Sequence, residues 1–192
     1  MIEIKKLRQL EYEARNQVLK VFVDAYYEEL ADLCKNRYKW QKALAESFDG
    51  DVFYIALEHG RPVGLAACVS KNQVAAKLDK KKFLSSLGLI KGMIGYTILK
   101  KELETLHDFG EKTGYITSVG TSPQYQGRGI ASQLFEHIAH HSGYEYFVLE
   151  VVDKNEKAYR LYEKMGFTAF SRIPAKFFEK KYFKERIYMK LG

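Results

Sequence analysis

The chain has 192 residues, of which 46% are apolar and 29% charged, so disorder is excluded and residues 1–192 are expected to form one domain. Its net charge of +7 fits an anionic ligand or a solvated basic surface, but the lysine runs are short and no nucleic-acid motif is visible. No nucleic-acid partner is therefore expected. Two cysteines without metal or redox spacing and an N-terminus unlike a signal peptide predict a cytoplasmic protein.

The first seventy residues are expected to contain two helical regions and three strands. Apolar residues at helical spacing indicate the helices, and short apolar runs between turn residues indicate the strands. A hairpin turn joins the second and third strands, so these two are expected to be antiparallel. The elements are a strand at Ile2–Leu7, helices at Gln9–Val23 and Tyr27–Ala45 with a break near Lys35–Tyr38, and strands at Val52–Leu57 and Pro62–Val69.

The stretch Asn72–Leu106 is the unusual part of the chain. Its apolar residues follow a rough helical spacing, and Gly88 and Gly92 stand four residues apart, as small residues do in packed membrane helices. However, Lys91 lies mid-stretch, and the uncharged runs beside it are far shorter than the ~20 residues of a membrane span. We therefore expect a helical insertion at about 72–106 that covers one side of a cleft, and no membrane partner.

After Gly114 strands and helices alternate regularly. A strand–helix–strand unit implies two parallel strands joined by a right-handed crossover. The predicted fold class is therefore α/β, with a mixed sheet of about six to seven strands flanked by helices. The elements are strands at Tyr115–Ser122 and Tyr144–Val152, helices at Gly129–His141 and Glu156–Met165, and final strands at Phe167–Ser171 and Arg186–Leu191.

The stretch from Ser118 to Ser132 places two glycines between a strand and a helix. Gly127 and Gly129 can adopt backbone angles closed to other residues, and they let a ligand approach the main chain closely. The first turn of the helix that begins near Ile130 presents N–H groups without intrahelical partners, and the helix dipole adds to their attraction for anions. Together these features predict a pyrophosphate site.

Two common phosphate-binding patterns fit this loop poorly. The P-loop pattern, which ends in Gly-Lys-Ser/Thr, is absent. The dinucleotide fingerprint is closer, as Gly127-x-Gly129-x-x-Ser132 with Glu150 at the end of the next strand, but its third glycine is missing. Too little chain remains after Val151 to complete that fold.

A third interpretation is a resemblance to a known family. Gln126-Gly127-Arg128-Gly129-Ile130-Ala131 is similar to the Gln/Arg-x-x-Gly-x-Gly/Ala signature of the GNAT superfamily of acetyl-CoA-dependent N-acetyltransferases. Leu149-Glu150-Val151 and then Asn155-x-x-Ala158-x-x-Leu161-Tyr162-x-x-x-Gly166-Phe167 follow in the family's order and separation. The resemblance covers about Tyr115–Phe167 closely, whereas residues 72–106 fall outside it.

The resemblance implies antiparallel N-terminal strands and two central parallel strands that splay apart, with acetyl-CoA in the gap between them. The backbone of the strand before the loop would pair with the pantetheine arm, and the loop N–H groups would hold the pyrophosphate. Arg128 would pair with a phosphate or is an ordinary surface arginine, and Asn155 would contact the cofactor, cap its helix, or do both. The implied cofactor-binding residues are Val119, Gly120, Thr121, Gln126, Gly127, Arg128, Gly129, Ile130, Ala131, Ser132, Asn155 and Tyr162.

Tyr162 is the candidate general acid. A tyrosine with an unperturbed pKa near 10 keeps its proton at neutral pH and can protonate the departing CoA thiolate. The alternative is a core tyrosine that packs one helical turn from Tyr159.

The general base is less well defined. Many GNAT members carry a glutamate on the strand before the glycine loop, and Tyr115–Val119 contains none. Glu150 is the best substitute, because some peptide-acetylating relatives use a glutamate in this Leu-Glu-Val setting; otherwise it is a surface or ion-paired glutamate. His107 and Asp108 are lesser candidates.

The resemblance implies an enzyme that moves the acetyl group of acetyl-CoA to a primary amine by direct attack in a ternary complex. The acceptor is either a small molecule or a peptide or protein amine, and a homodimer is left open. The alternative function is a non-catalytic CoA- or nucleotide-binding regulatory module. No metal is expected: His137 and His141 stand four residues apart on one helix, but no third ligand is evident.

Overall fold

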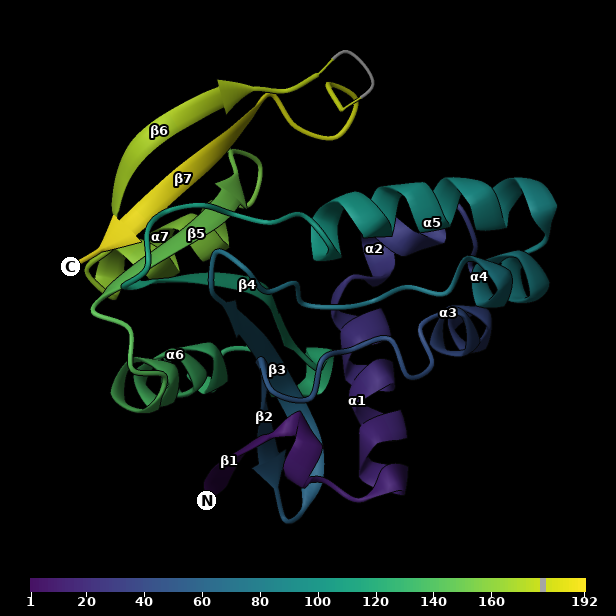
Figure 1. The fold of residues 1–192 in the computed structure, drawn as a ribbon, viewed down its shortest axis with the longest axis horizontal. Coiled ribbons are helices and arrows are strands. Elements are labelled where there is room, and N and C mark those ends of the chain that lie inside the picture. Colours follow the sequence, from purple (N-terminus) through teal and green to yellow (C-terminus); the bar gives the residue numbers. More distant parts are fainter. Residues whose placement is uncertain (177–178) are drawn as a thin grey trace.

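The structure is a computed structural model that describes residues 1–176 and 179–192. Within this part of the chain seven strands form one sheet in the order β1-β2-β3-β4-β5-β7-β6, flanked by helices (Figure 1). Only β4 and β5 pair in parallel, and every other neighbouring pair is antiparallel. The predicted α/β fold with a mixed sheet is therefore confirmed.

The elements follow the predicted order. The strands are β1 (Ile2–Lys6), β2 (Phe53–Glu58), β3 (Arg61–Val69), β4 (Thr113–Thr121), β5 (Tyr146–Val152), β6 (Thr168–Pro174) and β7 (Glu185–Leu191). The α-helices are α1 (Tyr12–Ala25), α2 (Tyr27–Ala31), α3 (Arg37–Ala43), α4 (Lys80–Leu87), α5 (Leu89–Leu103), α6 (Ile130–His141) and α7 (Glu156–Lys164). Two short 3-10 helices are η1 (Leu7–Gln9) and η2 (Pro123–Tyr125).

Several predicted boundaries shift by a few residues. The first helix begins at Tyr12 because a 3-10 turn occupies residues 7–9. The break in the second helical region lies at residues 32–36, since the Asn36 side chain caps α3 by accepting the N–H of Lys39 at 3.1 Å. β5 begins at Tyr146 instead of Tyr144, and β6 continues beyond Ser171 along β7.

Two hydrophobic layers cover the two faces of the sheet, because neighbouring strand residues point to opposite sides. On β5, Val148 belongs to the layer built from α1, α3, α4 and α5, whereas Leu149 belongs to the layer built from α6 and α7. The central strands are thus buried on both faces, and ligands can reach their backbone only where the strands separate.

The parallel pair separates midway along its length, as the resemblance implied. β4 and β5 pair from Thr113↔Tyr146 to Ile116↔Leu149, and β4 then continues to Thr121 without β5 beside it. A bulge lies at the same level of β4, where two of its residues stand opposite one residue of β3, and Ser118 adopts a positive φ of 54°. Such a bulge bends its strand and increases its twist, which opens the gap.

The stretch 72–106 contains α4 and α5, joined at Gly88 with a φ of 86°. Gly92 allows α5 to approach α4, because a Cβ there would lie 2.6 Å from the Phe83 carbonyl oxygen. Gly95 makes room for Trp40 of α3 in the same way. The predicted helical stretch is thus confirmed, and Gly92 and Gly95 are packing positions. No helix within the described residues is long and apolar enough to cross a membrane.

Candidate functional site

The loop between β4 and α6 has the backbone geometry that its glycines predict. Gly127 and Gly129 have φ values of 78° and 73°, and no atom lies within 4 Å of the place where a Cβ would sit on either. Gly129 is the N-cap of α6 and has no side chain to occupy the first N–H groups of that helix. These donors therefore border open space at the positive end of the helix dipole, where an anion is favoured.

The remaining loop residues surround this open space. Gln126 and Arg128 are exposed, and the Arg128 guanidinium lies 4.8 Å from the centre of the Tyr125 ring and, through Nη1, 3.8 Å from Glu58 Oε1. Ile130 turns inward and is buried, whereas the predicted residues Ala131 and Ser132 are partly exposed in the first turn of α6. Arg128 is thus held weakly and can turn toward a bound anion.

The end of β4 contains the three residues predicted to bind the pantetheine arm. The Val119 carbonyl accepts a hydrogen bond from the Tyr26 hydroxyl at 3.0 Å, and a carbonyl oxygen has a second lone pair for a further donor. Gly120 packs against α1, since a Cβ there would lie 2.8 Å from that of Ala25. Thr121 pairs with Gly64 of β3 on the side away from β5.

Tyr26 belongs to this site although nothing in the sequence pointed to it. It is the residue that follows α1, and the tertiary structure brings it beside Val119. Burial raises its pKa strongly, and the neighbouring Tyr162 raises it further. Two protonated tyrosine hydroxyls therefore stand near the point where β4 and β5 part.

The helix α7 supplies the two other predicted residues. Asn155 caps this helix, because its side-chain oxygen accepts the N–H of Ala158 at 3.1 Å, so its predicted capping role is confirmed. Tyr162 is buried and packs edge-on against Phe167, with the ring centres 5.8 Å apart. Burial raises the pKa of Tyr162 to about 12, so the hydroxyl keeps its proton throughout the neutral range.

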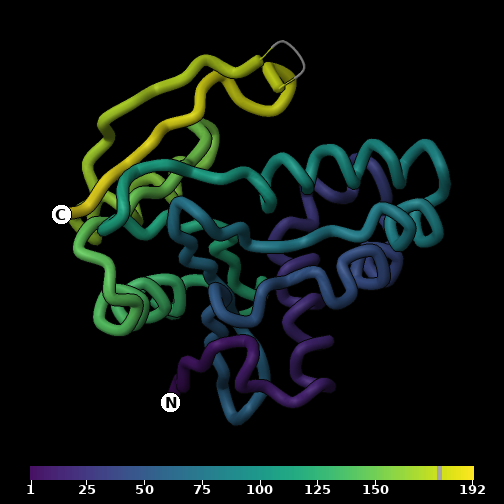
Figure 2. Tube along the Cα trace, in the orientation of Figure 1, coloured from purple at the N-terminus to yellow at the C-terminus, as the bar shows by residue number. Residues whose placement is uncertain are grey.

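Glu150 lies on β5 directly after the last residue that pairs with β4, and it is ion-paired. Arg186 Nη1 donates to its carboxylate, while Arg186 Nη2 lies 3.1 Å from Glu102 and 3.0 Å from Glu179. One guanidinium thus connects β5, the end of α5 and the segment before β7. Residues 179–184 reach over the C-terminal end of α5 (Figure 2), where Lys101 Nζ contacts Glu179 Oε1 at 2.6 Å.

His107 approaches Glu150 from the end of the helical stretch. Its ring stacks on that of Tyr115, with the centres 3.8 Å apart. Burial lowers the pKa of His107, although the charges of Glu150 and Glu102 oppose this shift. The imidazole is therefore neutral at pH 7 and able to accept a proton. Of the minor sequence candidates, His107 lies near enough to Glu150 and Glu102 to feel their charges, whereas the exposed Asp108 side chain accepts the N–H of Gly110 at 3.2 Å.

The sequence did not single out Arg186, the ion-pair partner of Glu150, or the two other carboxylates that pair with Arg186. Arg186, Glu102 and Glu179 come from separate segments, and a lone charged residue in each gives no signal of its own. The two helix histidines, His137 and His141, stack with ring centres 4.1 Å apart. No group of three or more His, Cys, Asp or Glu that could hold a metal ion is found in residues 1–176 and 179–192.

Comparison with known proteins agrees with this geometry. The model of the acetyltransferase (GNAT) family matches residues 15–167. No curated protein matches the chain in sequence.

Solved structures show the same fold at low sequence identity. An N-acetyltransferase from Staphylococcus aureus Mu50 has a TM-score of 0.64 and 18% identity, covering 98% of this chain and 100% of its own. The ribosomal-protein-S18-alanine N-acetyltransferase of Escherichia coli has a TM-score of 0.54 and 15% identity, covering 100% and 93%. A Salmonella typhimurium protein described as an acetyltransferase, solved with its cofactor acetyl-CoA, has a TM-score of 0.54 and 15% identity, covering 100% and 94%.

Proposed function

The chain belongs to the GNAT family of acetyltransferases, and from this premise we propose that it moves the acetyl group of acetyl-CoA to a primary amine by direct attack in a ternary complex. The observation that supports this most is the open glycine loop at the start of α6, beside the point where β4 and β5 part. The loop N–H groups would bind the pyrophosphate, and the exposed β4 backbone would pair with the pantetheine arm. We further propose that residues 1–192 act as one domain in which α4 and α5 are an insertion.

The proposed chemistry needs one proton removed and one supplied. The amine nitrogen attacks the thioester carbonyl, a C–N bond forms, and the C–S bond breaks to release the CoA thiolate. Tyr162, protonated because burial raises its pKa to about 12, would donate a proton or a hydrogen bond to that sulfur. A base must take the proton of the attacking amine, which rests mostly as ammonium at pH 7.

We propose Glu150 as the base and keep His107 as the second candidate. Glu150 lies where the strands part, but its carboxylate also accepts hydrogen bonds from Arg186 and Tyr188, so it would have to act through water or after Arg186 moves. His107 is neutral at pH 7 and lies near the same carboxylate. The stacking of its ring on Tyr115 near this carboxylate, together with a pKa that burial lowers, favours His107 as the alternative base.

The proposed acceptor is an amine, carried either by a small molecule or by a peptide or protein. One solved relative acts on an alanine of a ribosomal protein, and another is a complex bound to a peptide and CoA. Both are compatible with a peptide acceptor here, and neither determines one at such low identity. The cytoplasmic location and a homodimer stay predictions.

Release of free thiol from acetyl-CoA in the presence of a panel of amines and peptides tests the proposal. An acetyltransferase releases CoA thiol only when a suitable amine is present. A non-catalytic CoA-binding module would bind CoA in calorimetry and release no thiol with any amine.

Three variants then assign the base. We expect Glu150→Gln to lower kcat at least about 100-fold, the usual contribution of a general base, and His107→Gln to lower it less. Glu102→Gln is the matched control, because it removes another carboxylate from Arg186 without touching Glu150. If His107→Gln has the larger effect, the base is His107; an equal loss in Glu102→Gln would show that only the ion-pair cluster matters.

A further inference from the structure

The helix α5 is apolar on both of its faces, although the protein covers only one. Its inward residues Gly92, Gly95, Leu99 and Leu103 are buried. Its outward residues are exposed, with side chains that are between 40% and 78% accessible: Leu89, Ile90, Met93, Ile94 and Ile98. On a surface helix the apolar residues normally lie on the face that packs on the core, with polar residues on the opposite face. The outward face of α5 is therefore an apolar surface that the rest of the protein leaves exposed to solvent.

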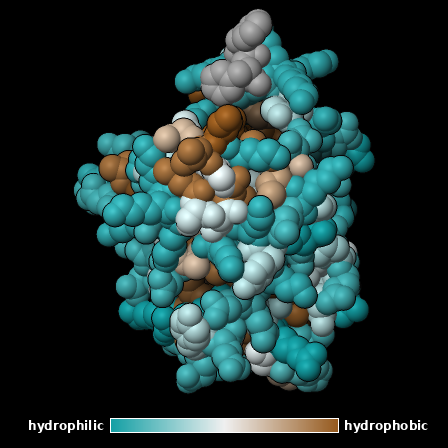
Figure 3. Space-filling view, turned by 90° about the vertical axis from the view of Figure 1, so that its right-hand side faces the viewer, coloured by the Kyte–Doolittle hydropathy of each residue, from teal (hydrophilic) through white to brown (hydrophobic). Residues whose placement is uncertain are grey.

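This face gathers into one patch on the surface. Figure 3, in which the right-hand side of Figure 1 faces the viewer, shows apolar side chains concentrated in the upper half and surrounded by polar ones. Single exposed apolar residues are ordinary on protein surfaces, whereas a contiguous patch rimmed by polar groups marks an interaction site.

Basic side chains accompany the patch. Between Lys77 and Lys101 the sequence has seven lysines and one aspartate, a net charge of +6 in a chain whose total is +7. Lys77, Lys80, Lys81 and Lys91 are exposed. The following carboxylates are engaged, Glu102 by Arg186 and Glu104 by Lys100, while Lys82 and Lys101 pair with Glu46 and Glu179. The positive charge beside the patch therefore rests mainly on the four exposed lysines just named.

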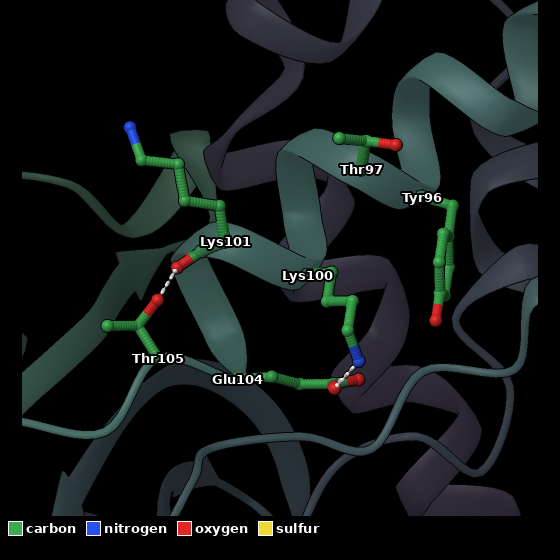
Figure 4. Close-up of a pocket in the computed structure, with 6 residues that line it drawn as sticks. All are labelled: Tyr96, Thr97, Lys100, Lys101, Glu104 and Thr105. Atoms are coloured by element: carbon green, nitrogen blue, oxygen red, sulfur yellow. Dashed lines mark hydrogen bonds and ion pairs between the residues drawn. The ribbon is translucent and has the colours of Figure 1, made fainter.

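At the C-terminal end of the patch the surface becomes polar. A shallow hollow of about 360 Å³ on α5 is lined by Tyr96, Thr97, Lys100, Lys101, Glu104 and Thr105. Figure 4 shows the Lys100 ammonium reaching Glu104 while the Lys101 side chain points the other way. Both ammonium groups are ion-paired, that of Lys100 with Glu104 and that of Lys101 with Glu179, so this end of the patch is polar and has little net charge.

We propose that the outward face of α5 docks the protein onto an anionic membrane surface. An apolar helix face flanked by lysines inserts at the boundary between acyl chains and headgroups, and its lysines are attracted to anionic lipids. The sequence led us to expect no membrane partner because no stretch is long enough to span. A helix that lies in the plane of the interface needs no such length.

A second copy of the chain fits this face less well. Two copies meeting through α5 would bring two sets of lysines together, and like charges across an interface weaken it. An anionic surface neutralises the same lysines.

Co-sedimentation with vesicles tests the proposal. We expect the full chain to bind vesicles of equal parts phosphatidylcholine and phosphatidylglycerol at least about tenfold more tightly than vesicles of phosphatidylcholine alone, and to lose this preference in high salt. Ile94→Asp should weaken binding at least about tenfold, because it places a charge in the apolar face. Lys91→Glu should weaken it by a smaller factor.

Matched controls separate the patch from general effects. Ile173→Asp makes the same change on β6 at a similarly exposed isoleucine, 48% accessible against 44% for Ile94, and should bind vesicles like the unchanged protein. Lys157→Glu on α7 is the control for Lys91→Glu. Equal binding to both kinds of vesicle, or equal losses in the controls, would overturn the proposal. The proposal would also be overturned if the protein bound no vesicles and instead formed a concentration-dependent dimer that Ile94→Asp abolishes.

Discussion

The proposed coenzyme side, made of the glycine loop and the end of β4, differs from the proposed acceptor side, the ion-pair cluster around Glu150, in how the chain brings the residues together. On the coenzyme side the bulge of β4, the glycine loop and the start of α6 lie within the single stretch Ser118–Ser132. On the acceptor side Arg186 joins Glu150, Glu102 and Glu179, and its partner Glu102 is 84 residues away in sequence. Local backbone geometry therefore builds the first side, and long-range packing builds the second. Substitutions on the two sides should therefore impair different properties, namely coenzyme binding, turnover or stability.

Gly129→Glu should give the largest effect, on the coenzyme side. The new carboxylate would stand where the pyrophosphate is expected, so CoA affinity in calorimetry should fall at least about 1,000-fold. Gly143→Glu is the matched control, because Gly143 follows the other end of α6, has a φ of 81° and likewise has open space at its Cβ position. Both variants carry similar backbone strain. If both keep the fold and only Gly129→Glu loses CoA affinity, the glycine loop is supported as the pyrophosphate site. Unchanged affinity in Gly129→Glu would refute it.

Tyr162→Phe should have the next largest effect, on turnover alone. Loss of the proton donor should lower kcat about 100-fold with little change in the KM for acetyl-CoA. Tyr159→Phe, one helical turn away, should keep full activity. Because the pKa of Tyr162 is about 12, kcat of the unchanged enzyme should not fall between about pH 8 and 10 through this group. Full turnover in Tyr162→Phe would remove Tyr162 as the acid.

Glu179→Gln should have the smallest effect, and on stability instead of coenzyme binding. Burial alone would raise the pKa of Glu179, but hydrogen bonds from Lys101 and the backbone N–H of Lys176, together with the charge of Arg186, lower it to about 2. A carboxylate with a lowered pKa stabilises the fold above its ordinary value near 4.5, and this contribution disappears as the pH falls from there to about 2.

Urea unfolding at two pH values measures that effect. At pH 7 Glu179→Gln should lower the free energy of unfolding by about 1–2 kcal/mol, since Lys101 is partly exposed, and the difference should shrink toward zero near pH 2. Glu163→Gln, at an exposed position of α7, should change stability little at either pH. A loss at pH 7 that persists unchanged near pH 2 would show that the ion pairs of Glu179 are not its cause.

Much of the coenzyme side could be predicted from the sequence because its signals are local. Glycine spacing indicated the positive φ values at Gly127 and Gly129, and Asn155 was recognisable as a helix cap. The bulge at Ser118 could not be predicted, since serine has no preference for a positive φ and the offset appears only when β4 is paired with β3.

The sequence by itself determined the order of the elements, the parallel β4–β5 pair and the glycine loop, because periodicity and turn chemistry act over a few residues. Only the tertiary structure decided that Tyr26 binds the Val119 carbonyl, that Arg186 holds Glu150, and that one apolar face of α5 is left uncovered. These facts depend on which distant segments come to pack against one another. Hydrophobic burial drives that packing, and it is non-directional, so no short stretch of sequence specifies its outcome.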